Sequence, residues 1–190
     1  MAREFNTNPN ADFHQIVADM IKRDRYEVAK RINFGIIYGM SIDTLCRELG
    51  IPREEGEALL REYHERVPFM RPLMDHYKEK AKDEKVVRTL YGRRRHFAAA
   101  PTYAALNARI QGSAADIMKD AMVKVWESGV CDVVGAPLLT VHDELDLSSP
   151  DTAAGREAVA EIKHIMEHAA ALNLPLKVDV GSGPSWGECK

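Results

Sequence analysis

The stretch from Tyr103 to Glu127 constrains the fold most, because its alanine-rich composition predicts one long helix. Asn107 and Gln111 are four residues apart and therefore share a face of that helix. Amides on a helix are often merely exposed to solvent. In a nucleic-acid minor groove they could instead donate to acceptors that every base pair presents, which checks the shape of the pair without identifying its sequence. These two residues alone leave both interpretations open.

A second predicted helix, over 25–39, carries a cation and two aromatic rings in line. Lys30, Phe34 and Tyr38 follow one another at intervals of four residues, which places them on one helix face. At 1.5 Å per residue, Lys30 and Tyr38 lie about 12 Å apart along the axis. This suits a nucleoside triphosphate, with its phosphates at the ammonium group and its sugar and base at the rings. An amphipathic helix with a snorkelling lysine and core aromatics explains the spacing equally well.

The run 136–148 predicts a β-hairpin, because two apolar segments flank a short polar turn. His142, Asp143 and Glu144 fall at the tip of this hairpin. Carboxylates held at a hairpin tip are suitable ligands for Mg²⁺, which prefers oxygen. A solvated acidic turn is the alternative.

The remaining pattern is that of helices packed on a small antiparallel sheet, which defines an α+β domain. Residues 1–11 are expected to form a polar lead-in, and residues 176–180 a last strand of the sheet. Further helices are predicted over 12–22, from Pro52 to before Pro68, over 69–83 and over 151–171.

Bulk charge argues against a general affinity for nucleic acid, since the net charge is −3 and the pI is near 6.2. Any grip on phosphate must therefore be local, as in the basic cluster Arg93, Arg94 and Arg95, which is expected at a turn. The three cysteines lack metal-ligand spacing and predict a reducing compartment. No signal peptide and no membrane-spanning run are visible, so the expected location is the cytoplasm, with no membrane partner.

Together these segments resemble the family A DNA polymerases, of the DNA polymerase I type. The resemblance rests on residues 30–39, 89–95, 111–119, 141–144 and 180–186, which match family motifs in the family's order. It implies one fragment of a polymerase core, with helical fingers over about 12–85 and the C-terminal part of the palm over about 86–190. It also implies an enzyme of the cytoplasm of a bacterial or phage-infected cell.

The resemblance assigns roles to individual residues. The incoming dNTP is expected at His14, Lys30, Phe34 and Tyr38, and primer-template DNA at Arg93, Arg94, Arg95, Asn107, Gln111 and His142. Asp143 and Glu144 are expected to hold Mg²⁺, two ions being bound in the completed enzyme, and Lys30 to assist catalysis at the leaving phosphates.

Three departures from the family pattern qualify these expectations. Tyr26 and Tyr103 stand where the family usually has arginines that contact phosphate or DNA, and Arg25 could replace the first of these only with a local adjustment of the helix. The upstream palm motif that supplies a second metal-binding aspartate has no counterpart. We therefore expect template-directed DNA synthesis only when a partner chain supplies that aspartate, and no activity from this chain alone. A non-catalytic nucleotide- or DNA-binding remnant, a truncated form and a single-subunit RNA polymerase are the alternatives.

Overall fold

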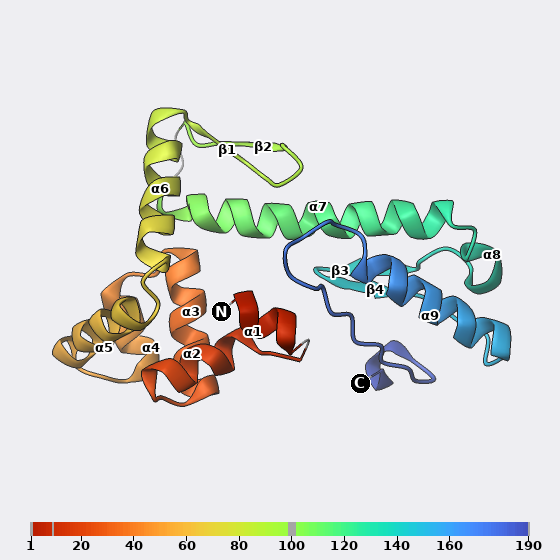
Figure 1. Ribbon diagram of the computed structural model, residues 1–190, viewed down its shortest axis with the longest axis horizontal. Coiled ribbons are helices and arrows are strands. Elements are labelled where there is room, and N and C mark those ends of the chain that lie inside the picture. Colours follow the sequence, from red (N-terminus) through yellow and green to blue (C-terminus); the bar gives the residue numbers. More distant parts are fainter. Residues whose placement is uncertain (1, 9, 99–101, 190) are drawn as a thin grey trace. The chain divides into compact units, whose positions relative to one another are not determined.

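The computed structural model describes residues 2–8, 10–98 and 102–189, and for Ala2, Arg3 and Tyr26 it describes the backbone alone. The chain divides into two compact units (Figure 1). The first unit comprises Ala11–Ser113, and the second comprises the chain from Ala114 onward together with Ala2–Asn10. The expected α+β class is confirmed, since the described residues form helices and two antiparallel hairpins.

The first unit is mainly helical. Its helices are α2 (Phe13–Ile21), the π-helix η1 (Arg25–Ala29), α3 (Lys30–Tyr38), α4 (Ile42–Leu49), α5 (Arg53–Arg66) and α6 (Met70–Asp83). Side-chain caps begin three of them, because Asp12, Asp24 and Ser41 each accept a hydrogen bond from the backbone N–H three residues later. Gly39 and Gly50 end α3 and α4 in the left-handed conformation that glycine adopts without a steric cost.

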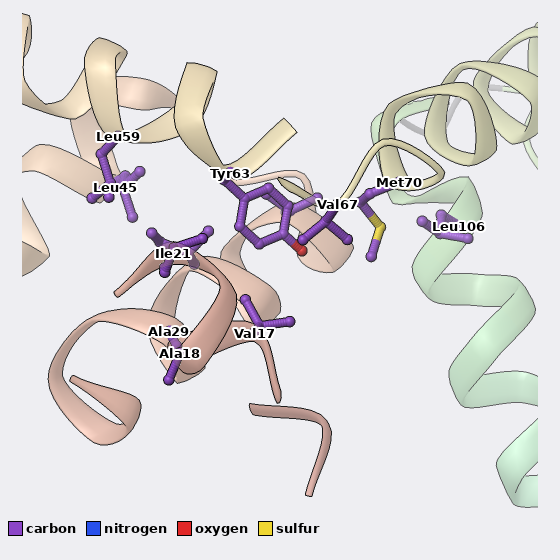
Figure 2. Packing of buried hydrophobic residues seen from close by; sticks show 12 residues of the cluster. Val17, Ala18, Ile21, Ala29, Leu45, Leu59, Tyr63, Val67, Met70 and Leu106 are labelled. Atoms are coloured by element: carbon purple, nitrogen blue, oxygen red, sulfur yellow. The ribbon is translucent and has the colours of Figure 1, made fainter. Parts of the chain in front are cut away.

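Tyr63 of α5 lies at the centre of the core of this unit. It is completely buried and packs among residues of α2 and of the segment after α5 (Figure 2). The cluster draws on every helix from α2 to α6 and on the first turn of α7 (Ala105–Glu127), with the buried members Val17, Ala18, Ile21, Ala29, Ile32, Ile36, Leu45, Leu59, Tyr63, Val67, Met70 and Leu106. Packing in this core therefore holds α2 and α3 against α5.

A short hairpin, β1 (Val86–Arg88) and β2 (Arg94–His96), follows α6 and is bound to the start of α7 by three hydrogen bonds. The Leu90 N–H donates to Ser113 Oγ at 2.9 Å, and Arg109 Nη1 donates to the Arg88 carbonyl at 2.6 Å. Arg93 Nη2 donates to the Gly112 carbonyl at 2.9 Å. In Figure 1 this hairpin extends from the end of α6.

The second unit contains the rest of α7, α8 (Cys131–Val134), the hairpin β3 (Leu139–Val141) and β4 (Glu144–Asp146), α9 (Ala153–Glu167), the short helix η3 (Trp186–Glu188) and α1 (Ala2–Thr7). Its core is smaller and lies between α7, α8 and α9, with the buried members Val125, Val130, Val134, Ala158 and Ile162. Within the described part of the chain, no helix is both long and apolar enough to span a bilayer.

One prediction of secondary structure is wrong. Residues 176–180 form no strand, because no neighbouring strand among the described residues offers them a ladder of hydrogen bonds. The expected polar lead-in contains the helix α1, from Ala2 to Thr7. The sequence analysis also missed α4 and the β1–β2 hairpin, although Ser41 and Gly50 are ordinary signals for the two ends of α4.

Candidate functional site

Three aromatic rings line up across α2 and α3. The His14 and Phe34 ring centroids are 5.0 Å apart, and those of Phe34 and Tyr38 are 6.2 Å apart. Phe34 is 40% exposed and Tyr38 50%, although both are large apolar rings. We call His14, Phe34 and Tyr38 the ring row. The structure thus brings together three of the four residues expected at a nucleotide, and two of them, Phe34 and Tyr38, are exposed.

Lys30, the fourth of these residues, begins α3 and is exposed. Its charge acts on the ring row: burial lowers the pKa of the His14 imidazole, and the positive charges of Arg25 and Lys30 lower it further. The carboxylate of Asp12 opposes this effect and raises the pKa. His14 is therefore a neutral ring beside cations at neutral pH, which is a suitable environment for an anionic ligand.

Arg25 could take the place of the usual arginine only if the helix before Lys30 were locally adjusted. The structure contains such an adjustment. Residues 25–29 form a π-helix, in which the Lys30 N–H donates to the Arg25 carbonyl five residues earlier. Arg25 therefore lies one helical turn before Lys30, as a residue four positions earlier would in an α-helix. Its guanidinium pairs with Asp12, and this hydrogen bond is the main reason why the pKa of the Asp12 carboxyl is lowered. The side chain of Tyr26 lies outside the described residues.

Tyr103, of the short helix η2 (Thr102–Ala104), packs directly on the end of α3. A Cβ atom at Gly39 would lie 2.5 Å from Tyr103 Cδ2, so only glycine allows this approach. Asn107 and Gln111 follow on α7, and their amides have no partner among the described residues. Through Tyr103, the segment that leads into α7 contacts the end of α3 at Gly39.

The three basic residues of the cluster differ in environment. Arg93 binds the Gly112 carbonyl and so holds the hairpin on α7. Arg94 and Arg95 lie on β2 rather than at the turn, and alternation along a strand directs them to opposite faces. Arg95 lies 5.7 Å from the Phe97 ring centroid. The three arginine side chains therefore leave the hairpin in different directions.

The second unit carries the acidic turn, by which we mean His142, Asp143 and Glu144. β3 and β4 pair in antiparallel register, with Val141 opposite Glu144. His142 adopts φ of 55°, the positive value that a two-residue hairpin turn requires. All three side chains of the acidic turn are exposed.

The donor set of the acidic turn fits Mg²⁺ in kind. Mg²⁺ is commonly bound through one or two carboxylates, with waters and substrate phosphates completing its shell. Asp143 and Glu144 supply two carboxylates, and Asp146 on β4 has a buried Oδ2 atom without a hydrogen-bond partner in the described residues. No group of three or more histidine, cysteine or acidic residues is close enough to enclose a metal within the described ranges.

The sequence analysis missed a buried polar pair, Asn33 and Tyr63, that is hydrogen-bonded to His14 of the ring row. Asn33 is completely buried, and its Nδ2 lies 3.0 Å from His14 Nδ1, while the Tyr63 hydroxyl donates to its Oδ1 at 2.9 Å. The only signal in the sequence is an amide within an otherwise apolar run, residues 32–37.

Comparison with known proteins gives the same family throughout. The sequence profile of DNA polymerase family A matches residues 2–188. The thermostable DNA polymerase I of Thermus filiformis is 41% identical over 173 residues, and the DNA polymerase I of Deinococcus radiodurans is 38% identical over 181 residues. These matches cover 85% and 90% of this chain, but only 20% and 19% of the relatives.

A solved structure agrees with the sequence comparisons. The POL domain of Pol1 from M. smegmatis, in complex with DNA primer-template and dNTP, superposes with a TM-score of 0.87 at 31% identity. The match covers 99% of this chain and 36% of that one. A helical unit with exposed aromatic rings and a hairpin with an acidic turn are thus parts of a nucleic-acid polymerase fold. The chain belongs to DNA polymerase family A, of whose curated members it spans about one fifth.

Proposed function

We propose that this chain performs template-directed DNA synthesis, transferring the nucleotidyl group of a dNTP to a primer 3′-OH, as one part of a polymerase that a partner chain completes. The observation that carries the proposal is the ring row beside Lys30, with two rings about half exposed and a neutral histidine among cations. The solved relative is named as a complex with primer-template and dNTP, which supports the same ligands here.

In this proposal the residues of α3 bind the dNTP. Lys30 neutralises the phosphates that leave, while Phe34 and Tyr38 shape the pocket for base and sugar. His14 donates a hydrogen bond to the triphosphate. Rotation of the helical unit that carries these residues excludes water before the transfer.

Residues of α7 and of the two hairpins bind the DNA. Asn107 and Gln111 donate to minor-groove acceptors at the primer end, which every correct base pair presents. Arg93, Arg94, Arg95 and His142 contact the backbone. The low overall charge leaves this local contact as the main attraction for phosphate.

Asp143 and Glu144 would hold Mg²⁺. The metal would stabilise the charge that develops on the reacting phosphate. Two-metal transfer needs carboxylates from separate places, because the ions lie about 3.5–4 Å apart. The acidic turn provides one of these places, and we propose that an aspartate of the partner chain provides the other.

The surface of the second unit has features that suit the binding of a further polypeptide. The hairpin β3–β4 is a two-stranded sheet whose outer edges carry no strand among the described residues. Apolar side chains are exposed on it and directly before it, with Leu138 at 74% and Leu139 at 47%. Unpaired edges and exposed apolar residues are typical of a surface that another segment covers.

The test is purification of the native protein from its source, followed by mass analysis and primer extension. A stoichiometric companion, with dNTP-dependent extension only when both chains are present, is the expected result. A single longer polypeptide with the same activity would contradict the partner but not the polymerase. A lone 21.3 kDa species that binds dNTP without extending a primer would favour a non-catalytic remnant, and extension with ribonucleotides an RNA polymerase.

A further inference from the structure

The buried pair Asn33 and Tyr63 connects the ring row to the core of the first unit. Both residues are completely buried, so neither can exchange its hydrogen bonds for bonds to bulk water. The chain of contacts runs from the Tyr63 hydroxyl to Asn33 Oδ1, and from Asn33 Nδ2 to His14 Nδ1. In this series of hydrogen bonds, each end of the Asn33 amide has one partner.

These hydrogen bonds have a direction, which the orientation of the Asn33 amide sets. In the structure the Tyr63 hydroxyl donates to Asn33 Oδ1 at 2.9 Å, and the amide turns its NH₂ group toward His14. An NH₂ group can only donate, so the nitrogen that faces it, His14 Nδ1, must accept. A neutral imidazole carries one proton, which then has to reside on Nε2.

The surroundings of His14 make this choice matter. Burial and two neighbouring positive charges lower its pKa, so the ring is neutral at physiological pH and has a single N–H to donate. The tilted contact with Phe34, at 5.0 Å and 44°, and the edge contact with Phe13, at 5.8 Å, restrict rotation of the ring. A ring that cannot turn and carries one proton donates in one direction only.

We propose that Tyr63 and Asn33 are positioning residues that hold the neutral His14 ring as its Nε2–H tautomer, so that Nε2 donates to an anionic oxygen of the nucleoside triphosphate. This inference rests on the proposed function, since the triphosphate is the ligand proposed for the ring row. Two buried residues of the first unit, Asn33 and Tyr63, would then affect the affinity for the nucleotide through His14. Loss of a hydrogen bond to a charged oxygen should lower the affinity at least about tenfold.

The first measurement is the tautomer itself. NMR of the ¹⁵N-histidine-labelled chain distinguishes a protonated ring nitrogen from a bare one, and the signal that disappears in His14→Gln identifies His14. We expect Nε2 protonated and Nδ1 bare in the unaltered chain. In Tyr63→Phe, which keeps the volume of the ring, Asn33 can turn over and the Nδ1–H form should become populated. Tyr77→Phe, a hydroxyl deletion outside the chain of contacts, is the matched control and should leave the tautomer unchanged.

The second measurement is the affinity for dATP with Mg²⁺. Asn33→Leu should lower it about tenfold in the unaltered background. In the His14→Gln background, where an amide donates without any tautomer, the same substitution should lower it less than about twofold. A merely structural role for Asn33 would give equal losses in the two backgrounds.

Two results would overturn the proposal: an Nδ1–H tautomer in the unaltered chain, or an unchanged tautomer in Tyr63→Phe. If Asn33→Leu does not fold, Tyr63→Phe decides by itself. If the tautomer behaves as expected but dATP does not bind the unaltered chain, the proposed function fails at the ring row. The positioning of His14 would then stand without its ligand.

Discussion

The ring row and the acidic turn are held in place by different interactions. His14 is connected by hydrogen bonds to Asn33 and Tyr63, two completely buried residues of a large core. Asp143 and Glu144 are exposed at a two-residue turn, where the backbone pairing of β3 and β4 holds them. Binding and stability should therefore be coupled at the ring row and separable at the acidic turn. Four substitutions or conditions test this difference, from the largest expected effect to the smallest.

Asp143→Ala should lower primer extension by the completed enzyme by about a thousandfold, because it removes a metal ligand at the reacting phosphate. The free energy of unfolding should change by less than about 0.5 kcal/mol, since the side chain is exposed. Single-turnover extension and denaturant unfolding measure the two quantities. Glu161→Ala, an exposed carboxylate on α9, is the control and should affect neither. Near-normal turnover of Asp143→Ala would contradict the assignment of the acidic turn.

Asn33→Ala should show the opposite behaviour and destabilise the fold by about 2–3 kcal/mol. It leaves the buried Tyr63 hydroxyl without its acceptor and His14 Nδ1 without its donor. Denaturant unfolding at neutral pH measures the loss. Gln111→Ala, which removes an exposed amide of the same unit, should cost less than about 0.5 kcal/mol. Equal stabilities of the two variants would mean that the ring row is no better anchored than the acidic turn.

Gly39→Ala and Gly50→Ala compare two helix ends within the first unit, of which only the end of α3 is packed against Tyr103. Both Gly39 and Gly50 have positive φ, at 72° and 67°, but only Gly39 has a neighbour within contact distance. We expect about 1 kcal/mol of destabilisation at Gly50, from conformation alone, and about 2 kcal/mol or more at Gly39. Thermal unfolding of the two variants gives the difference. Adding Tyr103→Ala to Gly39→Ala should recover part of the loss, and no recovery would contradict the packing.

The pH dependence of stability should be concentrated in the first unit. Burial lowers the pKa of His14 and of His64 below 6.5, the value that unfolded histidine has. Below pH 6.5 the unfolded state therefore binds more protons than the folded state, and the free energy of unfolding falls as the pH falls toward the folded pKa. Asp12, whose pKa is lowered by Arg25, adds a loss below about pH 3.8.

Denaturant unfolding between pH 7.5 and about 5 measures this dependence. His14→Gln should flatten it, because glutamine does not titrate. Gln111→Ala, which removes no titrating group, should leave it as in the unaltered chain. A steeper dependence in His14→Gln would contradict the direction of the His14 shift.

The elements with regular patterns were predictable from the sequence, and those that depend on distant partners were not. The long helix ending at Glu127 and the hairpin around Asp143 follow from composition and alternation, which are local properties. Residues 176–180 have a strand-like pattern but form no strand, because pairing requires a neighbour that no local pattern supplies.

The same division applies to the candidate site. The alignment of Phe34 with Tyr38 follows from helical spacing, so the sequence predicts it. The contact of His14 with Asn33 joins residues 19 positions apart, and that of Asn33 with Tyr63 joins residues 30 positions apart. Such contacts depend on how α2, α3 and α5 pack, which spacing within a single helix does not determine.

The π-helix before Lys30 affects how this chain should be aligned with its relatives. A column-by-column alignment places Tyr26 at the position of the usual arginine and scores the residue as lost. In the folded chain the wide turn accommodates one additional residue, so Arg25 occupies the corresponding place one turn before Lys30. The wide turn therefore brings Arg25 to this place without changing the α-helical conformation of α3 after it.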